Sequence, residues 1–194
     1  MFDMDGVLID SHNVWFDIFN SALVHFGFNK ISRDEFDKNV WAINFSETVN
    51  KYFPGKTIEE LREYYYKNFD NFVVKIKKME NLNPILEDIK KKGLKIAVVS
   101  NTQSNIVRAI LRRIGVEDYF DIIVGGDMVQ KGKPDPEIVF VACDKLKVKP
   151  EEAILVGDTI YDKQAAESAG CGFVGYRMGN EKRINSLRDV LNFI

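Results

Sequence analysis

The 194-residue sequence has few cysteines and no long apolar run. Its two cysteines, Cys143 and Cys171, are far apart and lie among small or apolar neighbours. This excludes a disulfide-rich scaffold and a cysteine metal centre, and it favours buried free thiols in a reducing cytoplasm. We find neither a signal peptide nor an apolar run long enough to span a bilayer, so we expect a cytoplasmic protein with no membrane partner.

The sequence also lacks an excess of either charge. It has 27 Lys and Arg against 29 Asp and Glu, and its only notable basic run is the three lysines at 90–92. This balance predicts no bulk attraction to nucleic acid or to a membrane surface. Hydrophobic residues make up 45% of the chain, which is typical of a globular protein with a buried core. The length fits one large domain, or a domain with a substantial insertion.

In the second part of the sequence, short apolar runs alternate with helical patterns. The predicted strands cover residues 94–99 (LKIAVV), 120–124, 153–156 (AILV) and 173–176. The predicted helices cover residues 84–92, 104–114, 136–146, 162–169 and 181–193. Continuous apolar runs of this length are typical of buried parallel strands. The alternation therefore predicts an α/β fold with a Rossmann-like parallel sheet and helices on both faces.

Residues 13–75 are different, because they are aromatic-rich and helical with no clear strand. Ser32 with Glu35, and Thr57 with Glu60, have the spacing of capping boxes at helix starts. The predicted helices cover residues 13–26, from 32 onward, 44–53 and 57–70. We predict that residues 13–75 form a helical cap domain, inserted into a core domain made of residues 1–12 and 76–194. We expect the cap over the carboxyl ends of the strands, where open α/β sheets bind ligands.

The first eleven residues, MFDMDGVLIDS, place Asp3 and Asp5 two positions apart, directly before Gly6. Alternate residues of a strand point the same way, so both carboxylates would enter one space and would need a cation or a shared proton. The alternative is an ordinary turn, because Asp-Gly is common in turns. Only two residues precede Asp3, so either further residues precede this strand or the strand is a stub, and the sequence leaves both open.

Polar residues also follow the other predicted strands. They are Ser100, Asn101 and Thr102 after residues 94–99, and Asp158 and Asp162 after residues 153–156. Each could simply cap a helix. Because the carboxyl ends of parallel strands meet at one edge of a sheet, we expect these residues to converge with Asp3 and Asp5. Carboxylate oxygens suit a hard cation such as Mg²⁺, and a serine at a helix N-terminus suits phosphate.

Lys133, in the segment QKGKPDP, offers the counter-charge that phosphate and an acidic cluster both need. The alternative is a solvated lysine, which is the commoner case. Phosphoryl transfer depends mostly on positioning and charge neutralisation. A carboxylate can itself attack phosphorus and form an aspartyl-phosphate. The residue types therefore favour phosphoryl-transfer chemistry at this edge of the sheet.

Four segments together resemble the motifs of the haloacid dehalogenase (HAD) superfamily, in its phosphatase branch with a helical cap of the C1 type. They are DMDGVLIDS at 3–11, VVSNT at 98–102, GKPDP at 132–136 and VGDTIYD at 156–162. The resemblance covers essentially the whole chain. It implies a Mg²⁺-dependent phosphomonoester hydrolase that acts on a small phosphorylated metabolite, phosphoglycolate or a sugar phosphate, through an aspartyl-phosphate.

The resemblance also implies roles for the acidic residues. Asp3 would be the nucleophile and a ligand of Mg²⁺. Asp5 would be the general acid and then the general base, and would ligate Mg²⁺ through its backbone carbonyl. Asp158 would ligate Mg²⁺, and Asp162 would support the metal shell. Family members that act on carbon–halogen bonds lack an aspartate at the position of Asp5, so its presence argues against a dehalogenase.

For the phosphate, the resemblance implies that Ser100 binds the phosphoryl oxygens with help from the Asn101 amide. Lys133 would hold Asp3 and the phosphate. We prefer Lys133 to Lys131 for this role because it directly precedes Pro134.

The sequence departs from the family pattern at residues 39–46, where Trp41 stands in place of the usual glycine. Trp41 and Asn44 could reach the site, although a place in the cap core is the alternative for Trp41. Two other functions stay open: a mutase of the β-phosphoglucomutase type, and a non-catalytic binding protein with the same fold. A monomer and a homodimer are both compatible with the sequence.

Overall fold

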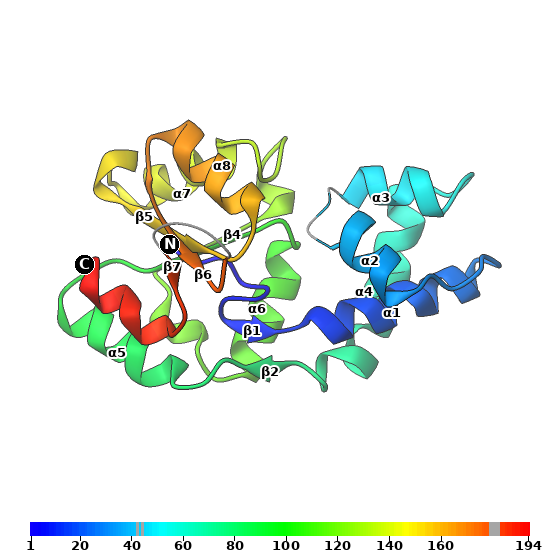
Figure 1. Cartoon of the computed structure of the whole chain (residues 1–194), viewed down its shortest axis with the longest axis horizontal. Helices are drawn as coiled ribbons and strands as arrows, with labels where there is room; N and C mark the ends of the chain where they lie inside the picture. Colours follow the sequence, from blue (N-terminus) through cyan, green and yellow to red (C-terminus); the bar gives the residue numbers. More distant parts are fainter. Residues whose placement is uncertain (42, 44, 179–182) are drawn as a thin grey trace. The chain divides into compact units, whose positions relative to one another are not determined.

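The computed structural model describes residues 1–41, 43, 45–178 and 183–194. It divides into two compact units: Met1–Asp10 together with Lys77–Ile194, and Ser11–Ile76. Figure 1 shows the elements of both units. Among the described helices, none combines the length and the apolar character needed to cross a bilayer.

The first unit is built on a parallel sheet. Its strands are β3 (Ala97–Ser100), β4 (Ile122–Gly125), β5 (Ile154–Gly157), β6 (Gly172–Tyr176) and β7 (Arg183–Ile184). Strand β3 pairs with β4, and β6 pairs with both β5 and β7, in each case parallel. Phe2 joins the two groups, because it forms parallel bridges with Val98 of β3 and Val156 of β5. The chain therefore starts in the middle of the sheet, and Asp3 follows at its edge.

Four helices cover this sheet. They are α5 (Leu82–Lys91), α6 (Ser104–Arg113), α7 (Glu137–Leu146) and α8 (Ile160–Ala169). Figure 1 shows α7 and α8 on one face and α5 and α6 on the other. Val99, Val124 and Leu155 are fully buried in the cluster that the sheet forms with α7 and α8. The predicted α/β fold with a parallel sheet is thus confirmed.

The predicted helix over 181–193 is wrong. Arg183–Ile184 forms β7, which pairs with Gly175 and Tyr176, and Leu187–Asn192 forms a 3₁₀ helix. Residues 181 and 182 lie outside the described part of the chain. Buried Leu187 and Val190 are three positions apart, a spacing that a helix with three residues per turn satisfies as well as an α-helix does.

Several short elements were not predicted. Strand β1 (Ile9–Asp10) pairs antiparallel with β2 (Lys77–Lys78) at the boundary of the first unit. Three further 3₁₀ helices cover Glu117–Tyr119, Gly126–Met128 and Pro150–Glu152. Elements of two or three residues carry no periodicity that a sequence pattern could show.

The described residues of the second unit form helices joined by loops, with no strand among them. It contains α1 (His12–His25), α2 (Arg33–Asn39), α3 (Phe45–Tyr52) and α4 (Ile58–Val73), which match the predicted helices. Helix α4 begins with the predicted capping box of Thr57 and Glu60, and the Ser32 side chain caps α2.

Aromatic side chains form the core of this unit. Phe19, Phe36 and Phe53 are buried there together. Trp41 is partly buried against the same cluster, with its ring 4.6 Å from that of His12. These contacts account for Trp41 as a packing residue. Asn44 lies outside the described residues.

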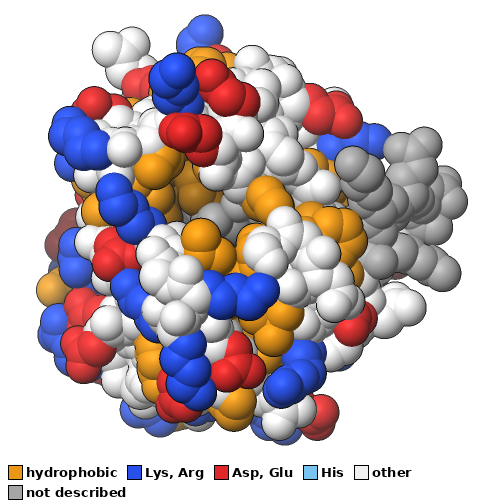
Figure 2. All heavy atoms as spheres, turned by 90° about the vertical axis from the view of Figure 1, so that its left-hand side faces the viewer, with side chains coloured by type: hydrophobic (Ala, Val, Ile, Leu, Met, Phe, Trp, Pro, Cys, Tyr) orange, Lys and Arg blue, Asp and Glu red, His pale blue; other side chains and the backbone are white. Residues whose placement is uncertain are grey.

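Acidic and basic side chains alternate over the face of the molecule in Figure 2, and neither sign forms a continuous area there. The mixed charges on this face are consistent with the balanced composition of 27 basic and 29 acidic residues.

Candidate active site

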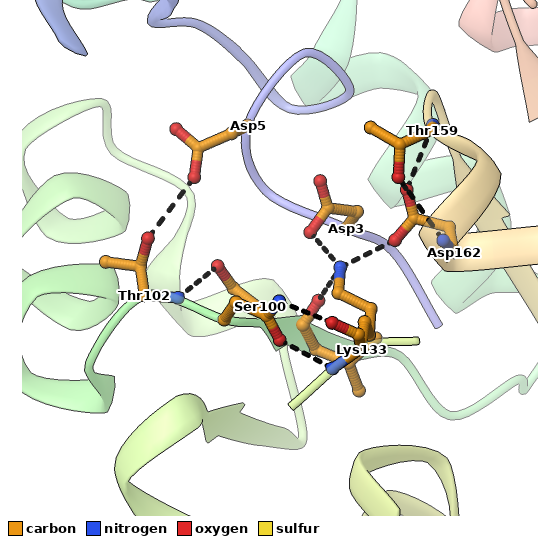
Figure 3. Close-up of polar contacts among 9 residues, drawn as sticks. Asp3, Asp5, Ser100, Thr102, Lys133, Thr159 and Asp162 are labelled. Carbon is orange, nitrogen blue, oxygen red and sulfur yellow. Dashed lines mark hydrogen bonds and ion pairs between the residues drawn. The ribbon is translucent and has the colours of Figure 1, made fainter. Parts of the chain in front are cut away.

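Residues from four separate segments meet at the carboxyl edge of the sheet, and Figure 3 shows most of them. Asp3 follows Phe2, Ser100 ends β3, and Asp158 follows β5. Asp162 lies in the first turn of α8, and Lys133 lies in the segment between β4 and α7. The parallel arrangement explains the convergence, because every strand delivers the residue after it to the same edge.

The ammonium of Lys133 is buried at the centre of this group. Its Nζ donates to Oδ1 of Asp3 at 2.5 Å, to Oδ1 of Asp162 at 2.6 Å and to the carbonyl of Val99 at 3.2 Å. Burial alone would lower the pKa of Lys133, but Asp162 and Asp3 outweigh it and raise the pKa above its ordinary value. Lys133 is therefore a fixed positive charge. Lys131, the alternative lysine, is exposed.

Three carboxylates surround this single ammonium. Asp3, Asp158 and Asp162 each offer an oxygen within 4.8 Å of the others. Burial raises the pKa of Asp3 well above its ordinary value, and although Lys133 opposes this, the neighbouring carboxylates add to it. Burial, followed by the charge of Asp162, raises the pKa of Asp158 to about 7. When all three carboxylates are ionised, the single charge of Lys133 therefore leaves the group with a net charge of −2.

Asp158 gives the clearest indication that a cation belongs here. Among the residues that the structure describes, none offers a hydrogen bond to its buried Oδ1. Gly6 has φ +76° and leaves room for this carboxylate, because a Cβ at Gly6 would lie 2.0 Å from Oδ2 of Asp158. An unpartnered buried oxygen is costly unless something else binds it. An oxygen-rich group with two excess negative charges fits a hard divalent cation.

Asp162 is held in a different way from Asp158. Its Oδ2 accepts from the backbone N–H of Thr159 at 3.1 Å and from the Thr159 hydroxyl at 2.5 Å. The Asp162 N–H in turn donates to the Thr159 hydroxyl at 3.2 Å, which completes a capping box at the start of α8. Thr159 therefore caps this helix, and Asp158 does not. Both oxygens of Asp162 already accept hydrogen bonds, from Lys133 and from Thr159. Asp162 is therefore better suited to holding Lys133 in place than to binding a cation.

Asp5 does not belong to this group of three carboxylates. The Met4 carbonyl accepts from the N–H groups of Leu8 at 2.9 Å and of Ile9 at 3.2 Å, so the chain turns directly after Asp3. Oδ2 of Asp5 accepts from the Thr102 hydroxyl at 3.4 Å, and Figure 3 shows this carboxylate turned toward Thr102. The strand alternation that we expected for Asp3 and Asp5 is thus interrupted, although the charge of Asp5 still raises the pKa of Asp3.

The loop after β3 holds Ser100 ready to donate a hydrogen bond. The backbone N–H of Thr102 donates to Oγ of Ser100 at 3.1 Å, which uses a lone pair of the hydroxyl and leaves its proton for another acceptor. Helix capping does not explain this segment, because Asp127 caps α6 instead. The Asp127 carboxylate accepts from the N–H of Ser104 at 2.6 Å and from the Ser104 hydroxyl at 2.8 Å.

Neither Asp127 nor Thr159 was predicted as a site residue. Thr102 was expected at this edge of the sheet, but its contact with Asp5 was not predicted. The Thr159–Asp162 spacing is a capping-box motif and could have been recognised in the sequence. The contacts of Thr102 with Asp5 and of Asp127 with Ser104 join residues 97 and 23 positions apart, and no local pattern marks them.

Several known proteins are similar to this chain in sequence and in fold. The family model described as haloacid dehalogenase-like hydrolase matches residues 1–176. A phosphorylated carbohydrates phosphatase from Thermotoga maritima is 30% identical over 175 residues, which cover 88% of this chain and 80% of that protein. A phosphoglycolate phosphatase from Aquifex aeolicus is 34% identical over 171 residues, again covering 88% and 80%. The crystal structure of a predicted phosphoglycolate phosphatase from Haemophilus somnus has a TM-score of 0.82 at 26% identity, covering 99% of this chain and 95% of that one.

Proposed function

Because this chain belongs to the haloacid dehalogenase-like hydrolase family, as its four motifs predicted, we propose that it is a Mg²⁺-dependent phosphomonoester hydrolase. We propose a small phosphorylated metabolite as its substrate, phosphoglycolate or a sugar phosphate. The names of two relatives support this choice, since one is a phosphoglycolate phosphatase and the other a phosphorylated carbohydrates phosphatase. The free, buried thiols are compatible with the cytoplasmic location that we expect.

The observation that carries the proposal is the Asp3–Lys133 pair. A carboxylate that attacks phosphorus must be ionised and must approach a phosphoryl group that is itself negative. Burial raises the pKa of Asp3, but the ammonium 2.5 Å from its Oδ1 acts against this and favours the ionised carboxylate. The same ammonium supplies positive charge at the place where the phosphoryl group would arrive. A purely structural ion pair would not need beside it an Asp158 oxygen that has no hydrogen-bond partner among the described residues.

Asp3 and Asp158 would hold the divalent cation, together with the backbone carbonyl of Asp5. A bound Mg²⁺ would neutralise phosphoryl oxygens and the excess charge of the carboxylates. Asp162 would keep Lys133 in place, because its own oxygens are occupied by Lys133 and Thr159.

The chain's own residues then perform two displacements. Asp3 attacks the phosphorus, the bond from phosphorus to the alcohol oxygen breaks, and Asp5 gives its proton to that oxygen. In the second step Asp5 takes a proton from water, and the water oxygen attacks the phosphorus of the aspartyl-phosphate. Inorganic phosphate leaves, and the Asp3 carboxylate is restored. Throughout, Ser100 donates its hydroxyl hydrogen to a phosphoryl oxygen and Lys133 neutralises charge.

Phosphate release from a panel of phosphorylated metabolites, with Mg²⁺ and with a chelator, tests the proposal. We expect release from one or a few small phosphomonoesters, only with Mg²⁺ and not from the Asp3→Asn variant. Turnover that needs a bisphosphate activator would favour the mutase. No turnover of any compound by folded protein would favour the non-catalytic binding protein, and either result would overturn the proposal.

A further inference from the structure

The side chain of Asn101 is bound by the backbone of Lys133 on both sides. The N–H of Lys133 donates to Oδ1 of Asn101 at 2.8 Å, and Nδ2 of Asn101 donates to the Lys133 carbonyl at 3.0 Å. The two residues are 32 positions apart. One carboxamide thus holds both hydrogen-bonding groups of one backbone unit, as a neighbouring strand would.

The glycine before Lys133 permits this contact. A Cβ at Gly132 would lie 2.4 Å from Oδ1 of Asn101, so any other residue would push the carboxamide away. The backbone of Asn101 is itself held close to another segment, because a Cβ at Gly126 would lie 2.3 Å from the Asn101 carbonyl oxygen. The N–H of Gly126 also donates to the carbonyl of Thr102 at 3.0 Å. The backbone of Asn101 is therefore held in place while its side chain binds Lys133.

The position of the Lys133 backbone matters because the Lys133 side chain extends from it to Asp3. Its ammonium meets Asp3, Asp162 and the Val99 carbonyl, which together take all its three protons. The lysine side chain is flexible, so its ammonium is placed by its acceptors and by the point from which the chain starts. A shift of the backbone would lengthen the contact with Asp3.

We propose that the Asn101 side chain is a positioning residue that fixes the backbone of Lys133, and thereby the ammonium beside Asp3. This inference rests on the proposed function, since it assumes that Asp3 reacts. It differs from the phosphate-binding role expected for the Asn101 amide, because the oxygen and the nitrogen of the side chain each make a hydrogen bond with the backbone of Lys133.

Loss of the Asn101 side chain should change kcat and KM to different extents. Loss of the side chain misplaces a charge that acts on the reacting carboxylate, and such misplacement costs about tenfold to a hundredfold in rate. Residues that bind the substrate equally in the ground and transition states change KM instead. We therefore expect Asn101→Ala to lower kcat by about tenfold to a hundredfold with little change in KM. Asn101→Asp keeps the acceptor for the Lys133 N–H and loses the donor, so its kcat should fall between those of wild type and Asn101→Ala.

The test combines kinetics with amide hydrogen exchange on the whole protein. In Asn101→Ala the amide of Lys133 should exchange faster, while amides of β5 and β6 keep their protection. Asn105→Ala is the matched control, because Asn105 is an exposed asparagine in the first turn of α6 and should behave as wild type.

Unchanged kcat, or a rise in KM alone, would overturn the inference. So would unchanged Lys133 exchange in a variant with reduced kcat, since the effect would then not pass through that backbone. If Asn101→Ala does not fold, Asn101→Asp gives the same comparison. Should wild type release no phosphate at all, the proposed function fails, while the exchange experiment still tests the contact.

Discussion

Nζ of Lys133 lies 2.5 Å from Oδ1 of Asp3, although 130 positions separate the two residues. Both side chains are almost fully buried, with exposed fractions of 6% and 8%. A buried charge that loses its partner is strongly destabilising, so this contact links the stability of the first unit to its proposed chemistry.

Replacing Lys133 should therefore affect both properties. We expect Lys133→Met to lower the free energy of unfolding by about 3–5 kcal/mol, because Asp3 and Asp162 are left as uncompensated buried acids. Phosphate release should be abolished. Lys131→Met is the control, since Lys131 is exposed and lies two positions away. Both variants are measured by urea unfolding and by phosphate release. Equal losses of stability and activity in the two variants would mean that the loop as a whole matters, and not the ammonium of Lys133.

Gly6→Ala should damage the site beyond the cost of its backbone angle. Gly6 and Gly170 have nearly the same φ, +76° and +74°, but a Cβ at Gly170 would meet nothing within 4 Å. Gly170→Ala should therefore show only the strain of a left-handed residue, about 1–2 kcal/mol. Gly6→Ala should show this cost and should also displace Asp158. We expect stabilisation by Mg²⁺ to be lost in Gly6→Ala and kept in Gly170→Ala, as measured by thermal unfolding. The same Mg²⁺ response in both variants would contradict the contact with Asp158.

Asp158→Asn tests the cation site without any substrate. At a Mg²⁺ concentration of about 100 times its Kd, wild type should gain about 2.7 kcal/mol of unfolding free energy. The variant should gain little, because it loses the carboxylate whose Oδ1 lacks a partner among the described residues. With chelator present, the variant should be at least as stable as wild type, since it removes one of three clustered carboxylates. An equal Mg²⁺ response would place the cation elsewhere.

Stability at acidic pH should depend on Asp121. Burial alone would raise its pKa, but the ammonium of Lys90 at 2.7 Å and the N–H of Ile96 at 2.6 Å outweigh it and lower the pKa below 3.8. A carboxyl group with a lowered folded-state pKa stabilises the fold above its unfolded value, and this is lost as the pH falls through the folded value. The side chain is 37% exposed, so we expect Asp121→Asn to cost about 1 kcal/mol or less at neutral pH.

The pH dependence provides the check on Asp121. The difference in unfolding free energy between wild type and Asp121→Asn should close as the pH falls below 3.8. Asp118→Asn, at an exposed neighbouring position, should show no such closing difference. A difference that stays constant from neutral to acidic pH would mean that the charge of Asp121 is not involved.

Local patterns in the sequence predicted the parallel strands well but not their ends. The run at residues 94–99 predicted a strand there, yet β3 is Ala97–Ser100. The ladder with β4 begins only at Ala97, because the backbone N–H of Ile96 donates to the Asp121 side chain and not to a neighbouring strand. Asp121 is 25 positions away in the sequence, so the apolar run alone could not show where pairing starts.

The parts of the candidate site that lie directly after a strand could be predicted from the sequence. Asp3, Ser100 and Asp158 each directly follow an apolar run or end a strand, and parallel topology brings them together. The place of Asp5 depends on the turn at Met4, and the contact of Asn101 with Lys133 depends on a loop 32 positions away. Such contacts are set by the folded backbone, and they leave no periodic pattern in the sequence.

The most direct test of the proposed mechanism is the mass of the Asp5→Asn variant during reaction with p-nitrophenyl phosphate. This compound releases a phenolate that needs no proton, so Asp3 can be phosphorylated without Asp5. The second step needs a base to activate water. We predict that Asp5→Asn gains the mass of one phosphoryl group, on Asp3, and that Asp3→Asn gains none. A phosphoryl group on another residue, or none on Asp5→Asn while wild type turns over the same compound, would contradict the account.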